Sequence, residues 1–112
     1  MTHTRFKSIS LDQMSTEQRR VAERAISGPR QTLTPPLNLF LRSAELADPL
    51  ERFGEYVRFR SPIPHRLKEF MILLIARHWT SQYPWSMHYS RAIEAGISAS
   101  VVNQIAAGQQ PT

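Results

Sequence analysis

The sequence predicts an all-α protein, a helical bundle of about six helices. Apolar residues recur at three- and four-residue spacing in successive segments, which is the periodicity of amphipathic helices. Glycine and proline fall between these segments, and no alternating strand pattern interrupts them. The connections are short, which favours helical hairpins.

The beginning of the chain divides into an aperiodic lead-in and a first helix. We expect residues 1–14 to be a partly ordered lead-in to one helical domain over residues 15–112. Ser15 followed by Gln18 fits a capping box, in which both side chains satisfy free backbone N–H groups. The first helix is therefore predicted over residues 16–27.

Two further helices are predicted before the middle of the chain, over residues 37–47 and 49–59. Asp48 and Pro49 mark the boundary between them, because Asp can cap a helix and Pro is well tolerated at its first position. Four apolar side chains are expected to be buried in the second of these helices: Leu50, Phe53, Tyr56 and Val57.

A fourth helix, predicted over residues 64–79, is apolar on almost every side. Such a helix belongs in the centre of a bundle or between subunits. Glu69 lies among its apolar residues, so we expect a buried carboxylate. The longest apolar run, Phe70–Ala76, is too short to cross a bilayer.

The last two helices follow a turn at residues 80–84. A helix is predicted over residues 85–95, with His88 on its apolar face and Gly96 as its left-handed stop. Ser98 then caps a final helix that ends before Gly108.

Composition excludes several classes of function. The chain has no cysteine, which removes disulfides, thiolate metal sites and thiol redox chemistry. The formal charge of +5 is compatible with an anionic partner, but the arginines are spread over every predicted helix. The N-terminal residues lack the apolar core of a signal peptide, so a cytoplasmic location is expected.

Three residues able to handle protons fall where two helices can bring them together: Glu69, Tyr83 and His88. A buried carboxylate beside an imidazole is a recognisable acid/base pair, and Tyr83 could extend it or orient a substrate. The alternative is structural, with Glu69 paired to Arg66 or Arg77 and His88 satisfied in a core. Spacing alone leaves both interpretations open.

Other sites are weaker. His65 and Glu69 stand four residues apart, but no HxxxH or HExxH motif supports a metal site, and no cofactor is expected. Trp79 and Trp85 bracket the turn, where they either pack or wall a small apolar substrate pocket.

A DNA-binding alternative comes from residues 92–111, which look locally like a helix-turn-helix. Its second helix, however, contains no Arg or Lys to hold phosphates or to read guanine. Nucleic acid is therefore an unlikely partner, and a membrane is not expected as one.

The segments RLKEFMILLIARHW, HYSRAIEAGIS and VVNQIAAGQQP, in this order, resemble the carboxymuconolactone decarboxylase and alkylhydroperoxidase D superfamily. The resemblance covers about residues 35–112, and it includes a His eight residues before a Gly, here His88 and Gly96. By this resemblance, Glu69, Tyr83 and His88 match the proton-relay residues of the family.

The resemblance also implies which branch of the superfamily the chain is similar to. Ser81 and Pro84 stand where the hydroperoxidases carry the cysteines of a CxxC motif, so thiol-dependent peroxide reduction is excluded. The implied activity is cofactor-free acid/base chemistry, a decarboxylation or proton transfer on a small organic acid or lactone. A catalytically inactive helical assembly module of the same fold is the alternative.

Assembly is the last expectation from the resemblance. Family members continue for several helices beyond the AGxxP segment, so this chain resembles a C-terminally shortened version. An apolar central helix with so little chain to cover it implies a homo-oligomer, a trimer or hexamer by the habit of the family.

Overall fold

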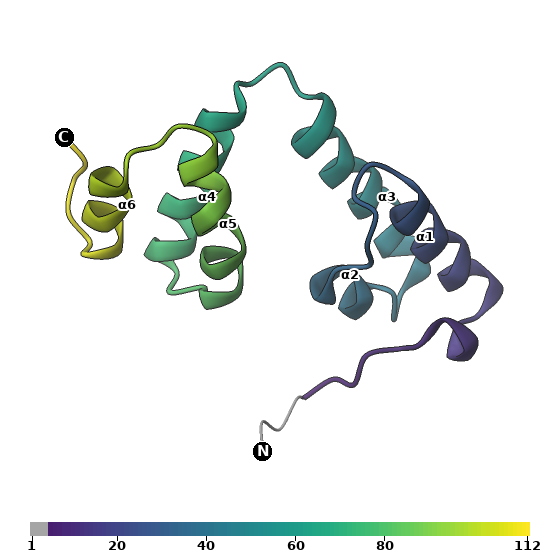
Figure 1. The fold of residues 1–112 in the computed structure, drawn as a ribbon. Helices are drawn as coiled ribbons and strands as arrows, with labels where there is room; N and C mark the ends of the chain where they lie inside the picture. The colour runs from purple at the N-terminus through teal and green to yellow at the C-terminus, as the bar shows by residue number, and fades with distance from the viewer. Residues whose placement is uncertain (1–4) are drawn as a thin grey trace. The chain divides into compact units, whose positions relative to one another are not determined.

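A computed structural model describes residues 5–112, and in that part of the chain the regular elements are all helices (Figure 1). The all-α prediction is confirmed. The chain divides into two compact units, residues 1–60 and residues 61–112. The α-helices are α1 (Thr16–Ser27), α2 (Pro35–Phe40), α3 (Ala44–Glu55), α4 (His65–His78), α5 (Gln82–Glu94) and α6 (Ala99–Ala106).

The first helix forms as the sequence predicts. The Ser15 side chain accepts a hydrogen bond from the backbone N–H of Gln18 at 3.2 Å, and the Gln18 side chain accepts one from the N–H of Ser15 at 2.9 Å. The Gln18 amide also donates to the carbonyl of Leu41 at 2.7 Å. The capping box therefore starts α1 and ties it to the end of α2.

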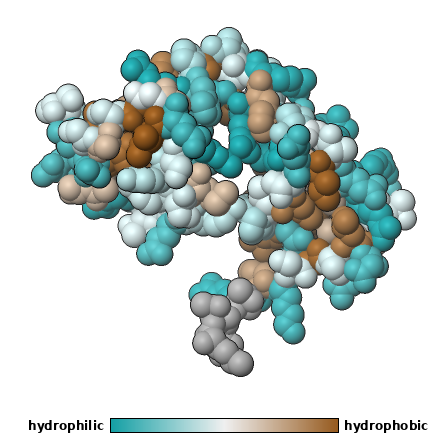
Figure 2. All heavy atoms as spheres, viewed as in Figure 1, coloured by the Kyte–Doolittle hydropathy of each residue, from teal (hydrophilic) through white to brown (hydrophobic). Residues whose placement is uncertain are grey.

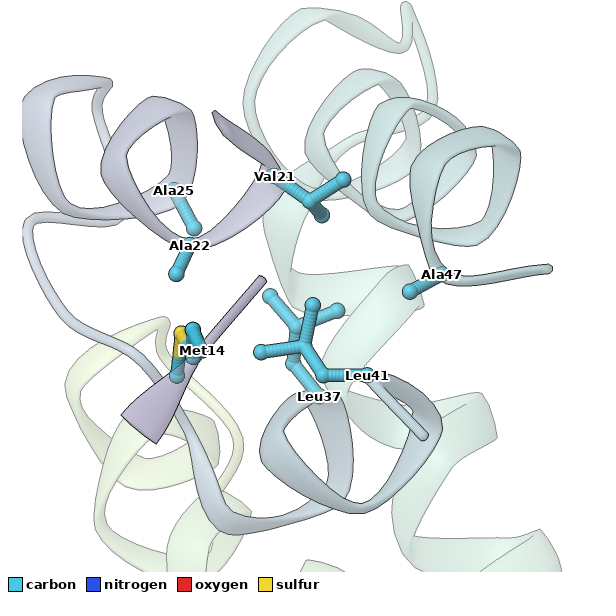
Figure 3. Packing of buried hydrophobic residues seen from close by; sticks show 7 residues of the cluster. All are labelled: Met14, Val21, Ala22, Ala25, Leu37, Leu41 and Ala47. Atoms are coloured by element: carbon cyan, nitrogen blue, oxygen red, sulfur yellow. The ribbon is translucent and has the colours of Figure 1, made fainter. Parts of the chain in front are cut away.

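The lead-in is attached to the first unit by Asn38. The N–H of Ile9 donates to the Asn38 side chain, whose amide donates back to the Ile9 carbonyl, both at 2.9 Å. A short 3-10 turn, η1 (Leu11–Gln13), follows before α1. Figure 3 shows the core that these elements enclose, formed by Met14, Val21, Ala22, Ala25, Leu37, Leu41 and Ala47.

The predicted helix boundary at Asp48 and Pro49 is wrong. The break comes earlier, where the Ser43 hydroxyl caps α3 by accepting from the N–H of Leu46 at 3.3 Å. Pro49 lies inside α3, where it removes one backbone hydrogen bond without ending the helix. The cap at Ser43 therefore determines where α3 starts.

The expected burial of the α3 apolar side chains is also wrong. Leu50 and Phe53 of α3 are exposed, Phe53 to 68%, and so is Tyr56 just after it, while Val57 is half-buried. Ala47 and Glu51 are the buried residues of α3. Glu51 is held by Arg24, whose Nε lies 2.9 Å from its carboxylate. This ion pair fixes which face of α3 meets α1. Beyond Glu55 the helix continues as a π-helical turn, η2 (Tyr56–Arg60).

The second unit is a helical hairpin with α6 packed against it. Helices α4 and α5 run side by side (Figure 1), and the core residues are Leu73, Ala92, Ile97, Val102 and Ile105. The predicted range of α4 is correct to one residue at each end. Helix α5 starts three residues earlier than expected, with Pro84 in its first turn, where its missing N–H has no partner to lose.

All three helices of the second unit end in the same left-handed turn. The N–H groups of Ser81, Ile97 and Gln109 reach back to carbonyls five residues earlier, at 2.7, 3.0 and 2.9 Å. The residue before each has positive φ: Thr80 at 51°, Gly96 at 101° and Gly108 at 73°. These are Schellman motifs, in which glycine is usual. Thr80 is the exception.

Within the described residues, none of the helices combines the length and apolar character needed to cross a bilayer.

Candidate active site

The hairpin brings Glu69 of α4 against His88 of α5. Oε2 of Glu69 lies 2.7 Å from Nδ1 of His88, a hydrogen-bonding distance. Glu69 is 2% exposed, as the sequence predicted, and the His88 side chain is 18% exposed. Neither predicted arginine partner of Glu69 forms an ion pair with it in residues 5–112. A charged group buried this deeply is retained where a partner compensates it, and His88 is that partner.

The geometry of this pair assigns a role to each imidazole nitrogen. Nδ1 faces the carboxylate, and an ionised carboxylate can only accept, so in the ionised form of Glu69 the shared proton is on Nδ1. Nε2 makes no hydrogen bond to any other described residue. Glu69 therefore orients the ring and leaves Nε2 to accept or donate a proton at the surface.

A second imidazole stands on the other side of the same carboxylate. Nε2 of His65 lies 3.8 Å from Oε1 of Glu69, beyond hydrogen-bonding distance but within range of an ion pair. The His65 side chain is 53% exposed. The spacing of four residues places both side chains on one face of α4, which was the available signal in the sequence. The described residues contain no cluster of three or more His, Cys, Asp or Glu able to hold a metal ion.

Tyr83 lies in the first turn of α5, rather than in a loop before the helix as expected. It is 40% exposed. Among residues 5–112 its hydroxyl is hydrogen-bonded neither to Glu69 nor to His88. The structure thus joins two of the three predicted acid/base residues directly, and it places the third, Tyr83, on α5 with His88 but without a hydrogen bond to either.

The two tryptophans have different surroundings. Trp85 is partly buried against the core and lines a pocket of about 400 Å³ at the α4–α5 turn. Trp79 is 74% exposed and packs edge-on against the ring of His78, with 5.0 Å between the ring centroids. Trp79 is not among the residues that line this pocket. Arg77, which the sequence did not single out as a site residue, is among them.

The helix-turn-helix interpretation gains nothing from α6. Its residues Val102 and Ile105 are buried in the core, and the helix has no Lys or Arg.

Comparison with known proteins gives no match to a family model, to a curated protein or to a solved structure.

Proposed function

We propose that the second unit carries the site of a cofactor-free enzyme that performs acid/base chemistry on a small organic acid or lactone. The observation that carries the proposal is the hydrogen bond between the buried Glu69 carboxylate and Nδ1 of His88. The resemblance of this region to carboxymuconolactone decarboxylases supports the same chemistry. No thiol takes part, since the chain has no cysteine.

In the proposed reaction His88 is the general acid and base. For decarboxylation, the bond between the substrate carboxylate and its neighbouring carbon breaks, and its electron pair moves into the adjoining unsaturated carbonyl system as CO₂ leaves. A proton from Nε2 of His88 then adds to the carbon that carried the carboxylate, and solvent protonates the imidazole again. Glu69 holds the ring in one tautomer and stabilises its protonated form. Tyr83 positions the substrate or relays a proton.

Assembly belongs to the same proposal. Large apolar side chains of the second unit are exposed, Ile75 to 61% and Trp79 to 74%, and hydrophobic atoms are visible at the surface in Figure 2. Exposed apolar surface of this kind favours a homo-oligomer, and the resemblance to carboxymuconolactone decarboxylases implies a trimer or hexamer. Static light scattering at micromolar concentration tests it, and a monomer would count against it.

Replacement of His88 tests the chemistry. The wild type is incubated with a panel of small lactones and carboxylic acids, and products are followed by proton NMR. We expect turnover of at least one compound and a loss of about 10²–10⁴-fold in His88→Ala. The far-UV CD spectrum and the oligomer size should be unchanged.

The matched control is His78→Ala, because His78 is an exposed histidine at the end of α4. It should retain full turnover. Equal turnover by wild type and His88→Ala would refute the role of His88, and no turnover of any compound by wild type would refute the proposed activity.

The second candidate function is a non-catalytic assembly module, which the exposed apolar side chains favour. It predicts a stable oligomer without turnover, and loss of folding in His88→Ala would support this structural role.

A further inference from the structure

The pocket at the α4–α5 turn combines a tryptophan wall, three hydroxyl groups and a cation. Its volume, about 400 Å³, lies within the range of roughly 300–1,000 Å³ typical of small-molecule sites. Trp85 supplies the aromatic wall, and Thr80, Ser81 and Ser86 supply the hydroxyls. The hydroxyls of Thr80 and Ser81 bond to no other side chain or carbonyl in residues 5–112. A ligand with acceptor atoms would satisfy them.

Arg77 gives this pocket an unbalanced positive charge. It is the sole charged residue among those that line the pocket, and no described carboxylate lies within ion-pair distance of it. In the first unit, by contrast, the pocket between α1 and α3 is lined by Arg24 and Arg52, both paired with Asp48. An unpaired guanidinium beside a cavity favours an anionic ligand.

The guanidinium of Arg77 is held in position by α6. Its Nε donates to the carbonyl of Ala106 at 2.9 Å, which leaves the two terminal nitrogens for other acceptors. A Cβ built on Gly108 would lie 3.1 Å from one of those nitrogens, so the guanidinium passes close over the glycine. The two remaining nitrogens have the fork geometry that matches a carboxylate.

The pocket is close to the acid/base pair along the same helix. Trp85 stands one turn before His88, so both lie on the same side of α5, separated by roughly 4.5 Å along the helix axis. Glu69, Tyr83 and His88 do not line the pocket themselves. The wall of the pocket at Trp85 therefore lies one helical turn from His88, and the pocket itself does not contain the acid/base pair.

We infer that this pocket is the binding site for a single-ring or similarly sized carboxylic acid, with Arg77 binding the carboxylate and Trp85 packing against the unsaturated body. The inference rests on the proposed function, which it deepens by naming the anchor of the acid. Arg77 also lines a pocket of about 370 Å³ with His78 and Gly108, which has neither a tryptophan nor a hydroxyl in its wall. A further pocket of about 380 Å³ has one arginine as well, and lies beside Arg66, Phe70 and Ser98. That pocket lacks Trp85 and offers one hydroxyl, so it serves as the internal comparison.

Fluorescence tests the site without any need for turnover. Trp79→Phe leaves Trp85 as the single tryptophan, because the chain has two. Benzoate is the probe, and benzamide is its uncharged counterpart of equal size. In this background we expect saturable quenching by benzoate and binding at least about tenfold weaker by benzamide, since one charge-assisted pair is lost. Equal binding of the two, or no saturable change, would overturn the inference.

Two arginine variants locate the carboxylate. Arg77→Gln should weaken benzoate binding by about tenfold or more, and Arg77→Lys by less, because the charge is kept and the fork is lost. Arg66→Gln, at the comparison pocket, should bind as the parent does. If Arg66→Gln weakens binding as much as Arg77→Gln, the acid occupies the second pocket and the inference fails.

Amide shifts in the unmodified protein give a readout that does not depend on the folding of a variant. Benzoate should shift the ¹⁵N–¹H signals of Ser81 and Ser86 and leave those of Gly96 and Ser98 in place. The opposite pattern would contradict the site. Benzoate binding by His88→Ala separates the two proposals. If the variant binds benzoate but the wild type turns over no compound, the proposed activity fails and the acid-binding site stands. If turnover depends on His88 but benzoate does not bind, the acid-binding site fails and the proposed activity stands.

Discussion

Nδ1 of His88 lies 2.7 Å from Oε2 of Glu69, and this contact joins the two helices of the hairpin through a carboxylate that is 2% exposed. A buried carboxylate without a partner would be strongly destabilising. The pair is therefore a structural link between α4 and α5 as well as the candidate acid/base site, and substitutions must separate the two roles.

Glu69→Gln keeps the shape of the side chain and removes its charge. We expect a loss of about 1–3 kcal/mol in the free energy of unfolding, because a charge-assisted hydrogen bond becomes a neutral one in a buried place. Urea unfolding followed by far-UV CD measures it. Glu94→Gln, at an exposed position of α5, is the control and should change little. Equal stability of Glu69→Gln and wild type would mean that the pair contributes no net stability.

The sequence predicted the second unit better than the first. The apolar surroundings of Glu69 and the glycines at 96 and 108 are local signals, and the structure agrees with them. The start of α3 was missed because Ser43 and the Asp48–Pro49 pair are competing signals, and the choice between them depends on packing. The buried face of α3 was missed for the same reason, because it depends on the ion pair between Glu51 of α3 and Arg24 of another helix, α1.

The candidate site shows the same limit. Helical spacing could bring Glu69 and His88 together because both lie on the apolar faces of neighbouring helices. It could not choose Arg77 among the arginines. That choice depends on the end of α6, which receives the Nε hydrogen bond at Ala106 and lies twenty-nine residues further along the chain.

Arg24→Met tests the ion pair that orients α3. The substitution leaves the Glu51 carboxylate, whose side chain is 1% exposed, buried without its cation. We expect a loss of about 3–5 kcal/mol, enough to unfold a small unit, in urea or thermal unfolding. Arg20→Met is the matched control on the same helix: its pair with Glu17 is exposed on both sides, and such pairs contribute less than about 1 kcal/mol.

A double variant distinguishes the buried charge from lost packing. Adding Glu51→Leu to Arg24→Met should restore much of the stability, because the uncompensated carboxylate is then gone. If the double variant is as unstable as the sum of the single ones, the packing of the arginine stem is the larger contribution.

The ion pairs of Asp48 should make the free energy of unfolding fall in acid. The hydrogen bonds from Arg52 and then Arg24 hold the pKa of Asp48 below its ordinary value. Since the folded-state pKa is the lower one, the contribution of Asp48 is fully present above the unfolded pKa of about 4 and is lost as the pH falls below it. The difference in urea midpoint between wild type and Asp48→Asn should therefore be constant from about pH 7 to 5 and narrow below about pH 4.

Glu23→Gln is the control for that titration, because Glu23 is an exposed residue of α1 with no ion pair in the described chain. Its urea midpoint should show no comparable difference from that of the wild type at any pH. The role of the Asp48 charge would be contradicted if the difference in urea midpoint between wild type and Asp48→Asn stayed unchanged down to the lowest pH at which the protein is folded.

Thr80 tests whether the α4–α5 turn carries strain beside the candidate pocket. Its φ of 51° is a left-handed conformation that a β-branched residue adopts at a cost, and the equivalent residues after α5 and α6 are Gly96 and Gly108. Thr80→Gly should raise the free energy of unfolding by about 1 kcal/mol, since relief of strain exceeds the added flexibility of the unfolded chain. Gly96→Ala is the reverse experiment and should lower the free energy of unfolding by a similar amount.

If strain at Thr80 is retained because its hydroxyl contributes to the pocket, the stabilised Thr80→Gly protein should also bind benzoate more weakly. Stability and binding that both stay at the wild-type level would show that the turn accommodates threonine without strain and that its hydroxyl has no part in the site.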